Sequence, residues 1–183
     1  MPPLSTMSLL LATAVLTGCG TDSVPAGGGG AAAAQERLAV TTRPGTDVLG
    51  PIGWRGLNLG MTQARAITTG LLAGRIGPPT PCQQWSTKRS DAVGTVLVSR
   101  RLGVAAITAA SGGDVQTPEG MTLGWTVDQV TRTYPAVSAA AQGENVRFVP
   151  VQKNPRARYR VGFDPGGRVS ALTLELAGQD CYA

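Results

Sequence analysis

A short internal repeat constrains the fold more than any other feature of this sequence. Residues 56–62 read GLNLGMT and residues 120–126 read GMTLGWT; the two segments align without gaps and share Gly, Leu, Gly and Thr at the same positions. Thr62 and Thr126 are both suitable helix N-caps, and Thr126 with Gln129 has the spacing of a capping box. No Gly-Lys-Ser/Thr follows either copy, which argues against a phosphate-binding loop. The repeat therefore predicts two helix starts in two related units.

Strand-like segments follow both predicted helices, which are expected over about 62–72 and 126–134. The strands expected after the first helix are 95–100 and 104–109, and those after the second are 146–151, 156–163 and 168–176. The expected fold is α+β, with two tandem helix-then-β-hairpin units, 51–116 and 117–183, that pack their helices on one face of an antiparallel sheet.

The final hairpin surrounds Asp164-Pro165-Gly166-Gly167, and a loop of even length would place Tyr159 opposite Leu172 and Arg158 opposite Thr173. One face is then largely apolar and the other polar, whereas a slip by one residue would mix the two faces. The polar face is expected to carry Arg156, Arg158 and Arg160. These arginines are interpreted as a surface for an acidic partner, with an ordinary solvated sheet face as the alternative.

The first 50 residues have the features of an export and anchoring segment. Residues 1–18 are expected to be a signal peptide, because the apolar stretch 7–16 is too short to cross a bilayer as a helix. Residues 16–19 read LTGC and resemble a bacterial lipobox, so Cys19 is expected to be acylated and to anchor the protein. The alternative is an ordinary cleaved signal with a chance Cys. Residues 19–50, rich in Gly, Ala and Pro, are expected to form a flexible tether.

Composition removes several classes of catalyst. The sequence contains no His, which excludes Ser-His-Asp and Cys-His catalysis and every His-ligated metal site. Its formal net charge of +5 is too modest to identify a partner, and nucleic acid is not expected for an exported protein with so few aromatic residues, 3 Trp, 3 Tyr and 2 Phe. Ser86 and Lys88 lie two positions apart, which on a strand would place both on the same face, but no oxyanion loop or Gly-x-Ser-x-Gly motif accompanies them.

Two cysteines remain once Cys19 is assigned to the anchor. An even number of cysteines in an exported chain predicts a disulfide, here between Cys82 and Cys181. The alternative, a reactive thiol, has no His that would lower its pKa.

The duplicated Gly-x-x-x-Gly-Met/Trp-Thr motif, with Ala66 and Val130 four residues after each Thr, supports a family resemblance. It resembles the envelope modules of SmpA/OmlA-type outer-membrane assembly lipoproteins and of β-lactamase-inhibitory-protein type. The segment from Thr117 onward is similar to a group of actinobacterial lipoproteins. This resemblance implies helices on one sheet face and a partner protein on the other. Trp125 replaces the usual Met, and none of the inhibitor's contact residues is matched, so β-lactamase inhibition does not carry over.

Together these features predict an exported protein, lipid-anchored on the extracytoplasmic face of the cell membrane. Its expected role is non-enzymatic binding of another envelope protein through Arg156, Arg158 and Arg160. No cofactor, metal or catalytic residue is expected. The alternative is a cell-envelope hydrolase that uses Ser86 or a carboxylate as its nucleophile.

Overall fold

The computed structural model describes residues 46–139 and 145–182. The expected signal peptide, the acylated Cys19 and most of the tether lie outside these residues. None of the helices in the described part of the chain is long and apolar enough to span a membrane. In chain order the elements are β1 (Asp47–Val48), β2 (Gly53–Trp54), β3 (Leu57–Asn58), α1 (Gln63–Thr68), β4 (Leu72–Ile76), β5 (Cys82–Thr87), β6 (Val93–Ser99), β7 (Gly103–Ala109), β8 (Val115–Gln116), α2 (Val127–Thr133), β9 (Ser138–Ala139), β10 (Val146–Pro150), β11 (Ala157–Phe163) and β12 (Val169–Leu176).

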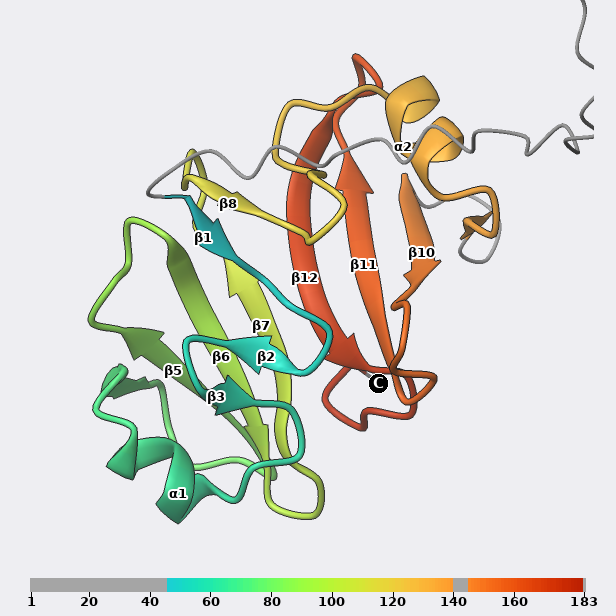
Figure 1. Ribbon diagram of the computed structural model, residues 1–183. Coiled ribbons are helices and arrows are strands. Elements are labelled where there is room, and N and C mark those ends of the chain that lie inside the picture. The colour runs from blue at the N-terminus through green and yellow to red at the C-terminus, as the bar shows by residue number, and fades with distance from the viewer. Residues whose placement is uncertain (1–45, 140–144, 183) are drawn as a thin grey trace, which may run out of the picture. The chain divides into compact units, whose positions relative to one another are not determined.

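One antiparallel sheet dominates the fold, in the order β4-β5-β6-β7-β12-β11-β10-β9 (Figure 1). The expected combination of helices with an antiparallel sheet is confirmed. The expected division into two helix-then-hairpin units is wrong. Each helix precedes four strands of this sheet, and the two sets of four merge where β7 pairs with β12. Strands β4 and β5 were missed because their sequences, LAGRI and CQQWST, lack the alternation of apolar and polar residues that marks a half-buried strand.

The repeated motif forms the start of each helix. Its glycines all have positive φ, from 76° at Gly60 to 91° at Gly120. At the start of α2 the Thr126 hydroxyl accepts a hydrogen bond from the backbone N–H of Gln129. The side-chain oxygen of Gln129 accepts one from the backbone N–H of Thr126, which confirms the predicted capping box.

Each copy of the motif also makes the same two backbone hydrogen bonds with the first residues of a long strand. The Gly60 amide donates to the Val104 carbonyl, and the Val104 amide donates to the Met61 carbonyl. In the second copy Gly124 and Trp125 make the equivalent pair of bonds with Val169. The repeat therefore attaches each helix to the last strand of the four that follow it.

The core lies between the sheet and a layer made of β1, β2, β3, β8 and their loops, which cross in front of the long strands (Figure 1). This layer buries Leu49, Trp54 and Leu57 against the sheet. The helices contribute little to it, since Ala66 of α1 and Val130 of α2 are their only buried residues. The expectation that the helices cover the face is wrong because each has only two turns or fewer and offers too little apolar surface.

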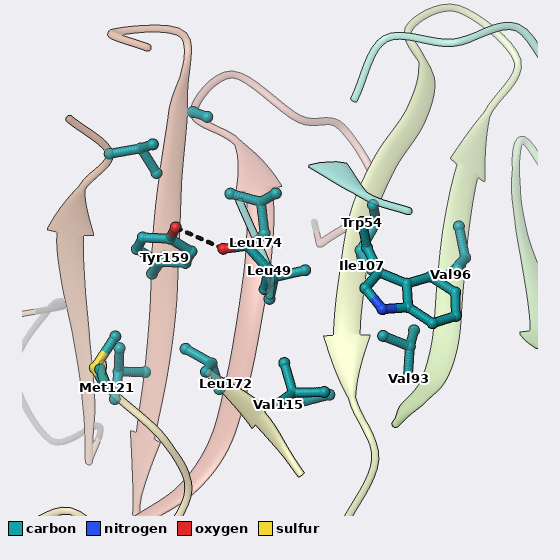
Figure 2. Close-up of a cluster of buried hydrophobic side chains, with 14 of the residues drawn as sticks. Leu49, Trp54, Val93, Val96, Ile107, Val115, Met121, Tyr159, Leu172 and Leu174 are labelled. Carbon is teal, nitrogen blue, oxygen red and sulfur yellow. Dashed lines mark hydrogen bonds between the residues drawn. The ribbon is translucent and has the colours of Figure 1, made fainter. Parts of the chain in front are cut away.

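A buried tyrosine holds the covering layer onto the sheet. Tyr159 on β11 donates a hydrogen bond of 2.8 Å from its hydroxyl to the carbonyl oxygen of Leu49 (Figure 2). Leu172 and Leu174 of β12 lie beside this pair, while Trp54 packs near Ile107 of β7 (Figure 2). The predicted apolar face of the final hairpin is thus the core face of the sheet.

The predicted register of that hairpin is wrong by two residues. Arg158 pairs with Glu175 rather than with Thr173. The loop is 165–167, because the Asp164 amide bonds to the Arg168 carbonyl, and a bulge shifts the pairing by one more residue between Gly162 and Phe163. A shift of one residue would exchange the two faces, but a second shift exchanges them back. Each side chain therefore lies on the predicted face, although it pairs with a different residue of β12.

The positive φ angles of the motif glycines give a direct test of its role. Gly60→Ala and Gly124→Ala should each lower the free energy of unfolding by about 1–2 kcal/mol, because L-residues are strained in the left-handed region. No heavy atom lies within 4 Å of the added Cβ in Gly124→Ala, so a steric clash does not contribute. Urea denaturation measures the change, and Gly178→Ala, at an equally open position without positive φ, is the control. Equal losses at Gly124 and Gly178 would contradict this account of the motif.

Candidate functional site on the open sheet face

The face of the sheet opposite the core is called here the open face. Two rows of paired residues cross it from β6 to β10. One row joins Leu97, Ala106, Glu175, Arg158 and Pro150, and the other joins Thr95, Thr108, Thr173, Arg160 and Phe148. At the centre, the hydroxyls of Thr108 and Thr173 are hydrogen-bonded at 3.0 Å across the junction of β7 and β12.

A C-terminal strap, residues 177–182, follows β12 and reaches the open face. Cys181 is bonded to Cys82 of β5 with a Cα–Cα distance of 5.4 Å, so the structure has the disulfide that the cysteine count predicts. Asp180 pairs with Arg101 at 3.1 Å. A hydrogen bond from Ser99 and the pairing with Arg101 lower the pKa of the Asp180 carboxyl. These contacts hold the strap across the ends of β5, β6 and β7.

A buried ion pair lies beneath the strap. Arg158 Nε donates to Glu175 Oε1 at 2.6 Å, the Glu175 side chain is 0% exposed and that of Arg158 is 30% exposed. The Arg158 guanidinium also stacks over the Phe148 ring, 3.8 Å from its centroid. Removing one partner of such a pair leaves an uncompensated buried charge and commonly costs about 3–5 kcal/mol. Arg158 therefore stabilises the fold as well as forming part of the surface. The sequence alone predicts only an exposed charge at this position.

Arg160 lies at the edge of the same cluster. Its guanidinium stacks over the Tyr182 ring of the strap, 4.8 Å from the centroid, and Tyr182 is 42% exposed. Burial and the charge of Glu175 raise the pKa of the Tyr182 hydroxyl, while Arg160 opposes the shift. Arg160 and Tyr182 thus form a cationic and aromatic rim.

This rim surrounds a hollow of about 520 Å³, lined by Phe148, Arg158, Arg160, Glu175, Gln179, Cys181 and Tyr182. Glu175 forms its floor. The second carboxylate oxygen of this residue, Oε2, is buried and has no hydrogen-bond partner in the described part of the protein. Burial raises the pKa of the Glu175 carboxyl, and the charges of Arg158 and Arg160 oppose that shift.

The third predicted arginine is not part of this cluster. Arg156 lies before the first residue of β11 and lines a different hollow with Ile52 and Leu59. The alternation of side chains that aligns Arg158 with Arg160 does not extend to Arg156, because the chain turns there instead of continuing as a strand.

The residues of the hydrolase alternative have other surroundings. The Ser86 hydroxyl donates to the Gly74 carbonyl of the edge strand β4 at 3.1 Å, and Lys88 is exposed in the turn after β5. Cys82, Asp180 and Cys181 lie close enough together to hold a metal ion, but the disulfide occupies both sulfurs.

Sequence reasoning missed four contributors to the hollow: Phe148, Gln179, Tyr182 and the burial of Glu175. The predicted disulfide was the available signal, since bonding Cys181 to Cys82 brings the neighbouring Tyr182 back toward the sheet.

No protein-family model and no curated protein matches this chain. Its structure is similar to the crystal structure of the uncharacterized protein YfeY from Escherichia coli, with a TM-score of 0.45 and 13% sequence identity over 69% of this chain and 98% of that chain. A similarity of this size carries no argument about function.

The buried carboxylate predicts a specific dependence of stability on pH. The pKa of Glu175 in the folded protein is raised above 4.5, its ordinary value in an unfolded chain. This residue therefore favours the folded state most at pH values below 4.5. Stability should then fall as pH rises through the folded pKa. Glu175→Gln should remove this fall, as measured by urea denaturation at several pH values. Asp128→Asn, at an exposed carboxylate of α2, is the control, and the same pH profile in wild type and Glu175→Gln would contradict the prediction.

Proposed function

We propose that this protein is exported and lipid-anchored on the extracytoplasmic face of the cell membrane, where it binds another envelope protein without catalysing a reaction. The observation that carries the proposal is the hollow of about 520 Å³ on the open face, with Arg160 stacked on Tyr182 at its rim. Arginine and aromatic side chains are the residues that most often dominate the binding energy of protein interfaces.

The charge of the site favours an acidic segment of the partner. Arg158 and Arg160 contribute two guanidinium groups and Glu175 one carboxylate, in a protein with a formal net charge of +5. Stacking on Phe148 and Tyr182 limits the freedom of both guanidinium groups before a partner arrives. Less side-chain entropy is then lost on binding.

The sequence supports the location of the protein independently of the hollow. The apolar stretch 7–16, the LTGC lipobox ending at Cys19 and the Gly-, Ala- and Pro-rich residues 20–45 follow one another in the order of a bacterial lipoprotein. The duplicated motif resembles that of envelope modules that bind other proteins. A tether of this composition would let the folded region sample a volume around its anchor.

The hydrolase alternative has weaker support. Ser86 is bound to a main-chain carbonyl within the sheet, and the sequence provides no His as a base. A Ser–Lys pair would need Lys88 to approach Ser86, but its side chain is exposed in the following turn. Loss of a measured hydrolytic activity in Ser86→Ala would favour this alternative.

The anchor is tested by acylation of Cys19. Cells that express the wild-type protein with a labelled fatty acid should incorporate the label, and the protein should remain in the membrane fraction. Cys19→Ala should abolish both, because the acylated sulfur is lost. Ser23→Ala, in the same segment but outside the lipobox, is the control for general effects of a substitution near the expected cleavage site. Membrane retention of Cys19→Ala equal to that of wild type would contradict the anchor.

The binding surface is tested by reversing one charge at the rim. Immobilised protein should capture a partner from solubilised envelope proteins, identified by mass spectrometry, and Arg160→Glu should slow its association several-fold at low salt. The difference should shrink in about 1 M salt, where the screening length falls to about 3 Å. Arg132→Glu, an equal charge change at an exposed position on α2, is the matched control. Association that is unchanged in Arg160→Glu, or equally slowed in both variants, would place the binding surface elsewhere.

A further inference from the structure

The floor of the hollow lacks one hydrogen-bond donor. Glu175 is 0% exposed; its Oε1 accepts from Arg158, whereas Oε2 is buried without a partner in the described residues. More than about 90% of buried polar groups in proteins are hydrogen-bonded, and a buried carboxylate oxygen is among the most costly to leave unpaired. A group that brings a donor into this hollow would therefore gain a strong, charge-assisted hydrogen bond.

The walls of the hollow supply donors. Arg160 lines the same hollow, and its guanidinium lies over the Tyr182 ring, 4.8 Å from the ring centroid. A guanidinium carries five N–H donors. Gln179 and the Tyr182 ring complete the wall formed by the strap. The hollow thus presents the unpaired acceptor Glu175 Oε2 together with donor groups on the side chains that line it.

This combination selects among ligand charges. A cationic group would meet Glu175 but also the guanidinium groups of Arg158 and Arg160, and an anionic group would meet those guanidinium groups but also Glu175. Two like charges therefore oppose a cation, and one like charge opposes an anion, in a partly desolvated site. A neutral group with a donor and an acceptor side by side meets neither penalty.

We propose that the hollow binds a primary amide, the side chain of an Asn or Gln in the partner protein. Its NH₂ group donates to Glu175 Oε2 and its carbonyl oxygen accepts from the Arg160 guanidinium. This inference rests on the proposed function, because it names the side chain that enters the same site. Glu175 and Arg160 are then the residues that determine specificity. The net positive charge of the site attracts the acidic residues that surround the amide in the partner.

In this proposal Tyr182, which lines the same hollow, controls access to the buried Oε2. It lies one residue beyond Cys181, it is 42% exposed, and its ring contacts the Arg160 guanidinium. The amide reaches Oε2 when this ring turns outward. Tyr182→Ala should therefore bind the amide probe faster than wild type.

The experiment measures the binding of four matched probes to the full-length protein in detergent micelles, by NMR of the Arg160 and Tyr182 side chains. The probes are the N-acetyl, N-methylamide derivatives of four amino acids with side chains of similar size. The glutamine side chain is neutral and polar, that of glutamate is anionic, that of lysine is cationic and that of methionine is apolar. The glutamine probe should bind at least about tenfold more tightly than each of the others, because a site that hydrogen-bonds a ligand rejects analogues lacking those groups.

Two variants locate the interaction. Glu175→Gln replaces the free acceptor by an amide and should weaken the glutamine probe by at least about tenfold, while Asp128→Asn should leave it unchanged. Arg160→Met, which leaves the buried pair of Arg158 and Glu175 in place, should weaken the same probe and serves if Glu175→Gln fails to fold.

Tighter or equal binding of the glutamate probe would overturn the amide assignment and make the hollow an anion site. Equal binding of the methionine probe would reduce it to an apolar contact. If no probe binds while Arg160→Glu still slows capture of the partner, this inference fails and the proposed function stands. If the Arg160→Glu and Arg132→Glu variants capture the partner at the same rate, the proposed function itself is contradicted.

Discussion

The pairing of β7 with β12 is the interaction on which the rest of the structure depends. It joins two sets of four strands, each continuous in the chain, through the pairs Thr108–Thr173, Ile107–Leu174 and Ala106–Glu175. The same pairs separate the two faces of the sheet. Ile107 and Leu174 enter the core, while the two threonines and Glu175 face the opposite side. A change of one residue in this register would bury the polar set against Trp54 and expose the apolar one.

The covalent link between Cys82 and Cys181 acts on the same junction from the outside. It spans 99 residues of sequence, and the loop-entropy model assigns a link of that length roughly 4–5 kcal/mol of stabilisation. It also carries the strap over Glu175, so that one bond serves both stability and the shape of the hollow. The burial of Glu175 is a consequence of this arrangement: a carboxylate at the middle of a sheet face becomes inaccessible once the strap and Arg158 enclose it.

The proposed site is unusual in combining a structural and a recognition role in neighbouring residues. Arg158 neutralises Glu175 and stacks on Phe148. Arg160, two residues along the same strand, lies over the ring of Tyr182 in the strap. Recognition is therefore assigned to the residue whose removal leaves no buried charge unpaired. A face built in this way can evolve its specificity at Arg160 and Tyr182 while the ion pair maintains the fold.

Local chemistry made part of this protein predictable. Two helix starts followed from Thr caps and glycines, and five strands followed from alternation and turn residues, because these signals act over a few neighbouring residues. The two faces of the final hairpin followed from a period of two, which survives a shift of two residues. The Cys82–Cys181 pairing followed from counting cysteines.

The tertiary structure alone decided how these elements combine. The layer containing Leu49 and Trp54 covers the core face in place of the helices, and β7 meets β12 across a long sequence separation that no local pattern encodes. The hollow depends on the same long-range contacts, since Phe148, Arg160, Glu175 and Tyr182 come from separate segments. The sequence by itself determined where the helices start and which segments form the five alternating strands. Only the packing of distant segments decided which charge is buried, which arginine remains at the surface and where the hollow lies.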